Sequence, residues 1–136
     1  MSELDSAVTA HVRESHADVI SAVDRCADAV AASWDGRRAT AREEVSDPLR
    51  AALREAGVLD RLPHVLADVV GAIGHEIPAS PVAAPPYVVV TSRGPMLRAT
   101  IEPGRLVVRL DAFDVRPEPG ARYERLDGVE VVVDLE

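Results

Sequence analysis

A proline-rich segment separates two parts of the sequence that have different hydrophobic periods. Residues 75–86 read His-Glu-Ile-Pro-Ala-Ser-Pro-Val-Ala-Ala-Pro-Pro, and this density of prolines excludes a helix and favours extended backbone. Before the segment, apolar residues recur every three or four positions, as on one face of a helix. After it they alternate, as on one face of a strand. The pattern predicts a single α+β domain over 1–136, with a helical part (1–74), a linker (75–86) and a β-sheet part (87–136).

The first predicted helix is long and has one apolar stripe. It spans about Glu3–Trp34, and two series of large apolar residues recur in it with a spacing of eleven: Val8, Val19, Val30 and Val12, Val23, Trp34. Eleven residues make three turns of a nearly straight helix, so one continuous helix keeps both series on the same face. We expect the lone cysteine, Cys26, on this buried face, where a thiol acts as a small apolar group.

Two further helices are predicted before the linker. One spans about Ala39–Ala56, with a break at Asp47-Pro48 as an alternative, because Asp is a good N-cap and Pro fits the first helical turn. The next spans about Asp60–Ile73, and Gly57 between them suits the left-handed position that ends a helix. The helical part therefore has three predicted helices, of which the first is the longest.

Short strands joined by short turns are predicted after the linker. They are Tyr87–Ser92, Met96–Glu102, Arg105–Val115, Tyr123–Leu126 and Val129–Leu135. Asp127-Gly128 between the last two is a hairpin signal, and short connections favour an antiparallel meander of four to five strands. Val129, Val131, Val133 and Leu135 face one way and Glu130, Asp134 and Glu136 the other, which indicates one buried and one mostly solvated face. We expect the helices to pack on the buried face.

The charged residues are unusual in kind as well as in number. The chain has 23 acidic against 15 basic residues, a net charge of −8, and no Lys, so every basic residue is Arg. This composition favours adaptation to molar salt, where a Debye length of about 3 Å screens the repulsion between acids. Codon bias in a GC-rich genome is the alternative. Both parts of the chain are acidic and aromatic residues are few, which argues against a nucleic-acid partner.

The sequence contains no common catalytic or cofactor signature. It lacks a Gly-x-Ser-x-Gly motif, a phosphate-binding loop and a dinucleotide fingerprint, and one cysteine excludes an internal disulfide or a cysteine-based zinc site. His11 and His16 are five residues apart, which is off the same-face spacing of a metal pair on one helix. We therefore predict no catalytic residue, no metal and no cofactor. The lack of a signal peptide and of a long apolar run predicts a cytoplasmic protein without a membrane partner.

The candidate ligand-site residues lie around the linker and the first predicted hairpin. They are His75, Glu76, Tyr87, Arg93 and Arg98. Two Arg side chains near one turn suit a carboxylate or phosphate, so this set predicts an anion-binding site. The alternative is structural: a His that favours a helix C-terminus, and an ordinary hairpin with solvated Arg side chains.

Two functional classes are consistent with these features. The favoured one is a non-catalytic interaction module that self-associates into a homo-oligomer through free strand edges. The alternative is a small enzyme or ligand-binding domain, whose anion-binding site lies near the linker and the first β-hairpin.

Overall fold

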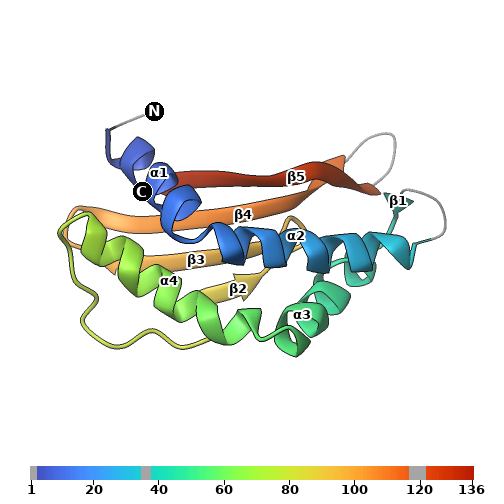
Figure 1. Ribbon diagram of the computed structural model, residues 1–136, viewed down its shortest axis with the longest axis horizontal. Helices are drawn as coiled ribbons and strands as arrows, with labels where there is room; N and C mark the ends of the chain where they lie inside the picture. Colours follow the sequence, from blue (N-terminus) through green and yellow to red (C-terminus); the bar gives the residue numbers. More distant parts are fainter. Residues whose placement is uncertain (1–2, 35–37, 117–121) are drawn as a thin grey trace.

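The computed structural model describes residues 3–34, 38–116 and 122–136. Over these residues a layer of helices covers one face of an antiparallel sheet (Figure 1). The helices are α1 (Glu3–Ser15), α2 (Ala17–Ala32), α3 (Ser46–Glu55) and α4 (Val58–Ala72), with a 3₁₀ turn at Arg42–Glu44. The strands are β1 (Arg38–Ala39), β2 (Val88–Val90), β3 (Pro95–Ile101), β4 (Gly104–Arg116) and β5 (Arg122–Leu135). The predicted α+β class is confirmed.

The sheet has the order β1-β5-β4-β3-β2, and all neighbouring strands are antiparallel. Strands β2 to β5 form the predicted meander. Strand β1 comes from the helical part and was not predicted, since it is only two residues long and pairs with Tyr123 and Glu124 of β5. Strands β1 and β2 are the two edges of the sheet.

The predicted long first helix is wrong, because the chain breaks at His16. This residue lies between α1 and α2 with φ −125° and ψ 31°. Its amide still donates to the Val12 carbonyl, and its carbonyl accepts from the Val19 amide, so the change of direction is confined to one residue. Helix α1 packs on β5 and α4, whereas α2 packs on α3, β4 and β5. Because the sheet beneath is twisted, two shorter helices follow it better than one straight rod.

The burial predicted for this segment nevertheless holds. All six members of the two eleven-residue series are at most 8% exposed, and Cys26 is buried with them. The helix predicted over about Ala39–Ala56 is too long, because α3 starts only at Ser46, next to the alternative break at Asp47-Pro48. The last predicted helix starts within two residues of α4, and Gly57 between α3 and α4 has the expected left-handed conformation, with φ 75°.

The predicted hairpin at Asp127-Gly128 is also wrong, because β5 runs through it as one bent strand. The register with β4 places residues 126–129 opposite a single residue, so the pair belongs to a large bulge in which Gly128 has φ 97°. The Arg125 guanidinium fills this bulge. Its Nη1 donates at 2.8–3.1 Å to three backbone carbonyls, those of Ala112, Leu126 and Gly128.

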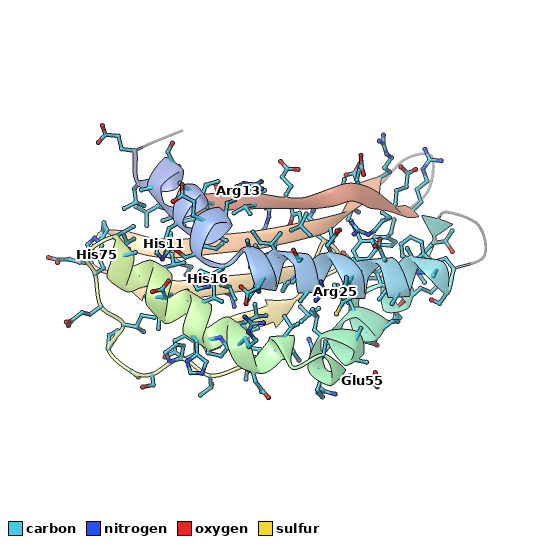
Figure 2. The ribbon with its side chains drawn as sticks, viewed as in Figure 1. His11, Arg13, His16, Arg25, Glu55 and His75 are labelled. Carbon is cyan, nitrogen blue, oxygen red and sulfur yellow. The ribbon has the colours of Figure 1, made fainter. Side chains whose placement is uncertain are left out.

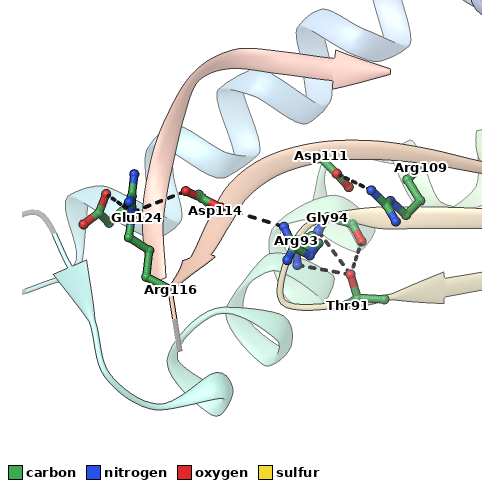
Figure 3. Close-up of polar contacts among 8 residues, drawn as sticks. All are labelled: Thr91, Arg93, Gly94, Arg109, Asp111, Asp114, Arg116 and Glu124. Atoms are coloured by element: carbon green, nitrogen blue, oxygen red, sulfur yellow. Dashed lines mark hydrogen bonds and ion pairs between the residues drawn. The ribbon is translucent and has the colours of Figure 1, made fainter. Parts of the chain in front are cut away.

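The two faces of the sheet differ as expected. The face under the helices is apolar, and its largest fully buried side chains include Leu97, Leu106, Leu110 and Phe113. The other face has Arg and acidic side chains in ion pairs, such as Arg109–Asp111 at 3.1 Å and Arg116–Glu124 at 3.3 Å (Figure 3). Within the described residues, no helix is long and apolar enough to cross a membrane.

Candidate metal centre

Three polar side chains meet where α1, the His16 break and α4 come together. The Nε2 atoms of His11 and His16 lie 2.6 and 2.7 Å from the same carboxylate oxygen, Oδ2 of Asp68. Figure 2 shows both histidines at the side of the N-terminal helices that adjoins α4. One atom from each residue lies within 4.8 Å of the others, so the three side chains form a compact donor set of two nitrogens and one oxygen.

The break at His16 is what brings the two imidazoles together. On a continuous helix, residues five apart point in directions about 140° apart. In this structure the backbone turn at His16 redirects its side chain, and the two rings lie edge to face with centroids 5.7 Å apart. The spacing argument against a shared site therefore fails, because it assumed an unbroken helix.

Asp68 is held at this position by the packing of α4. The neighbouring residues Leu66, Val69 and Val70 are buried against the core, which leaves Asp68 at the rim of the helix, facing α1. Its side chain is 50% exposed, whereas His11 and His16 are 28% and 17% exposed. The hydrogen bonds from His11 and then His16 hold the pKa of the Asp68 carboxyl below its usual value, against a small opposing effect of burial.

A second polar contact joins α4 to the same N-terminal helices. Arg61 of α4 forms an ion pair with Asp18 in the first turn of α2. The arginine hydrogen bond lowers the pKa of Asp18, and burial opposes it. The interface between α4 and the N-terminal helices thus has two sets of polar contacts at its exposed edge, while Val8 and Val12 of α1 are buried.

The donor set fits a transition metal such as Zn²⁺. Zinc binds imidazole nitrogen and carboxylate oxygen at about 2.0–2.2 Å, and ligands around a tetrahedral ion lie roughly 3.3 Å apart. The present separations of 2.6 and 2.7 Å are those of hydrogen bonds. Binding therefore requires loss of the bonding protons and a small outward movement of the side chains. Both changes are feasible at a half-exposed rim.

The residues predicted as a ligand site fall in separate places. His75 lies three residues beyond the end of α4 and takes part in its C-terminal cap. Its amide donates to the Val70 carbonyl at 3.0 Å, and Gly74 before it has a φ of 80°. This is a backbone role in a helix C-cap. His75 and Glu76 also line an open cavity of about 430 Å³ beside the linker, and none of the other predicted site residues lines it.

Tyr87, Arg93 and Arg98 lie along the first hairpin. The Arg98 amide donates to the Tyr87 carbonyl at 2.8 Å, and its Nε donates to the Pro86 carbonyl at 3.2 Å. The Arg93 carbonyl accepts from two amides of β4 at 2.7 and 3.1 Å, while its Nη1 lies 3.9 Å from Asp114 (Figure 3). Both arginine side chains thus contact neighbouring protein atoms, Arg98 at the end of the linker and Arg93 on β4.

Comparison with known proteins gives a family for the chain. Residues 6–136 match a family model described as "Domain of unknown function (DUF7988)". The chain belongs to this family. No curated protein and no solved structure matches it. The span that matches the DUF7988 model includes His11, His16 and Asp68.

Sequence reasoning missed these three residues for identifiable reasons. No Gly or Pro marks the break at His16, and Asp68 is 52 residues away from it along the chain. The one local signal is Asp18, an acid placed where the first turn of a new helix favours one. That signal is weak, since acids are frequent throughout this chain.

Proposed function

We propose that this protein binds a divalent transition metal ion, of the Zn²⁺ class, through His11, His16 and Asp68. The observation that supports the proposal is the convergence of three ligating atoms from α1, the α1–α2 junction and α4 within 4.8 Å. Two of the side chains come from neighbouring turns of the N-terminal helices, and the third, Asp68, is more than 50 residues away along the chain.

The donor types favour transition metals over Mg²⁺ or Ca²⁺. Imidazole suits Zn²⁺, Ni²⁺ and Cu²⁺, whereas Mg²⁺ and Ca²⁺ prefer oxygen ligands alone. Because Asp68 is half-exposed, the side of the site that faces solvent has room for water as a fourth ligand. An Asp carboxyl with a pKa at or below its usual value of about 3.9 is ionised at neutral pH, as a ligand must be.

The bound ion would act as a clamp between α1 and α4. Helix α1 has only two fully buried side chains, Val8 and Val12, among its described residues, so burial anchors it less than the longer α2. An ion ligated by residues of both α1 and α4 adds its binding free energy to the packing of α1 on the rest of the fold. An ion present at 100 times its Kd stabilises the folded state by about 2.7 kcal/mol.

The test is a metal titration of the full chain without a polyhistidine tag. Isothermal calorimetry with ZnCl₂ should give one site per chain, and Co²⁺ should show the visible absorption of a tetrahedral complex. For a chain of 136 residues, saturating Zn²⁺ should raise Tm by about 9 °C, from the entropy of unfolding per residue. His11→Ala, His16→Ala and Asp68→Ala should each weaken binding by about tenfold or more, a loss of 1.4 kcal/mol.

His64→Ala is the matched control. His64 is an exposed histidine of α4, one turn before Asp68, and it is not part of the three-residue set. The proposal is wrong if Zn²⁺ binds equally well to the His16→Ala and wild-type chains, or if His64→Ala causes the same loss. The proposal is also contradicted if the calorimetric titration gives no heat of Zn²⁺ binding and Zn²⁺ does not change Tm.

A further inference from the structure

Helices α1 and α2 are joined by a single residue, His16, and the sequence around it contains no helix breaker. Neither Gly nor Pro occurs between Glu3 and Trp34, and the two apolar series with a spacing of eleven continue across the junction. A period of eleven residues is that of one straight helix. The local sequence therefore favours a continuous helix, so the bend at His16 depends on contacts with other parts of the fold.

Tertiary contacts hold the bend. The His16 imidazole bonds to Asp68 of α4 at 2.7 Å, and Val8 and Val12 of α1 are buried where α1 packs on β5 and α4. The backbone at the bend departs from regular helical bonding. The Val19 amide donates to the His16 carbonyl three residues back, whereas a continuous helix uses the residue four back. Opening of the hinge restores that bonding, but it removes α1 from its packing site.

Helix α1 cannot remain released in water without loss of buried area. Val8 and Val12 are at most 1% exposed, and release would expose both side chains. Figure 1 shows α1 at one end of the helix layer, beyond the start of α2. The surface that fits a released α1 is therefore the one it came from, on β5 and α4. A second copy of the chain presents the same surface, because its sequence is identical.

We propose that two copies of the chain exchange α1 and form a closed two-fold dimer. In this dimer His16 is helical, α1 and α2 form one helix, and each α1 packs on β5 and α4 of the other copy. Val8 and Val12 stay buried, and His11 bonds to the partner's Asp68. Exchange of identical elements keeps the contacts of the monomer and adds regular helical bonding at each hinge, and short hinges favour it.

The exchange should depend on protein concentration and on salt. A single chain keeps α1 on its own core when it is dilute, whereas two chains meet more often as the concentration rises. Each copy has a net charge of −8, so two copies repel each other unless molar KCl screens the charge. The three candidate metal ligands converge only in the bent chain. A chelator is therefore present in all samples, so that the result does not depend on the metal proposed above.

Two substitutions at the hinge separate helix formation from loss of the imidazole. His16→Ala and His16→Gly both remove the hydrogen bond to Asp68, but Ala favours a helical hinge and Gly does not. Their helix propensities differ by about fivefold per residue, and a dimer has two hinges. The Kd of the dimer should therefore be about 25-fold lower for the Ala variant than for the Gly variant.

Ser21→Ala and Ser21→Gly are the matched controls, because Ser21 is an exposed residue of α2 that is helical in both forms. These two variants should have the same Kd. Each chain is refolded from urea at micromolar to millimolar concentration in molar KCl, and size-exclusion chromatography with light scattering measures the dimer.

A cross-link shows whether the dimer exchanges α1. The side chains of His11 and Asp68 are in contact, with Nε2 and Oδ2 2.6 Å apart. A chain with His11→Cys and a second chain with Asp68→Cys are refolded together and oxidised in air. The two introduced thiols meet only when α1 of the first chain lies on α4 of the second, and they then form a disulfide between the chains. Each variant refolded alone gives the background, since the native Cys26 is buried.

We expect the wild-type dimer to increase with concentration, the Ala variant to dimerise most readily, and the mixed variants to cross-link. The proposal is overturned if the wild-type and His16→Ala chains both stay monomeric at millimolar concentration, or if His16→Gly dimerises as readily as His16→Ala. A dimer whose mixed variants give no cross-link above background also overturns it, because such a dimer forms through another surface, such as the sheet edges.

Discussion

Arg125 should be the most important single polar side chain for the stability of the sheet. It is 14% exposed, and its guanidinium packs 5.9 Å from the Phe113 ring centroid while forming ion pairs with Asp24 and Asp28 of α2. Its Nη1 also serves the three carbonyls of the β5 bulge. Arg125 therefore both satisfies the carbonyls of the β5 bulge and links α2 to β5 through ion pairs.

Replacement of Arg125 by Ala removes the donor for four carbonyls, the three of the bulge and that of Asp24, and one side of two ion pairs. A buried acceptor left without a partner costs about 1–3 kcal/mol, and water entering the space recovers part of this. We expect a total loss of about 3–5 kcal/mol, which is a large part of the 5–15 kcal/mol typical of a domain. Arg125→Lys should lie between wild type and Ala, since Lys retains the charge but lacks the planar fork.

Urea denaturation followed by circular dichroism in molar KCl measures this loss. Arg122→Ala is the matched control, because Arg122 is an arginine of the same strand whose contact in the described structure is Glu124 at 4.0 Å. Its replacement should cost about 0–1 kcal/mol, as for a surface pair. If Arg125→Ala also costs less than about 1 kcal/mol, the bulge does not depend on this side chain and the reasoning is refuted.

Four further predictions follow from the structure and the composition. Gly94→Ala places a Cβ 2.0 Å from the Leu110 carbonyl oxygen at φ 148° and should destabilise the fold by about 2–4 kcal/mol in urea unfolding, whereas Gly71→Ala, with open space around it, should not. Because the pKa of folded Asp68 is lowered, its contribution to stability is present above its unfolded value of about 3.9 and is lost as the pH falls through the folded pKa. The stability difference between wild type and Asp68→Asn, measured with a chelator present, should therefore shrink from pH 7 towards pH 3, and a constant difference would contradict the assignment. Thermal melts should show Tm rising from millimolar to molar KCl if the acidic surface is an adaptation to salt, and no gain above roughly physiological 0.2 M would leave codon bias as the explanation. Self-association stays a prediction, and light scattering that shows a strict monomer over the micromolar range would remove it.

The hydrophobic pattern of the chain is sufficient to predict the class of the fold and many of the core positions. The change of hydrophobic period across 75–86 separates helices from strands, because side chains repeat every 3.6 residues on a helix and every two on a strand. The eleven-residue series in the first segment marked buried positions correctly, since burial depends on which side chains are apolar and survives a local change of direction. The hydrophobic period and the positions of apolar residues are local properties of the sequence, so they can be read without knowledge of the tertiary contacts.

The bends of the chain and the contacts between distant residues depend on how the elements pack together. The break at His16 and the bulge at Asp127-Gly128 both depend on partners elsewhere: the twisted sheet under α1 and α2, and the Arg125 guanidinium that replaces lost ladder bonds. The candidate metal centre exists because of the first of these bends and of Asp68 on α4. Neither the hydrophobic period nor the residue spacing predicts the contact of Asp68 with the two histidines. These residues are more than 50 positions apart in the sequence, and only the packing of the helices brings them together.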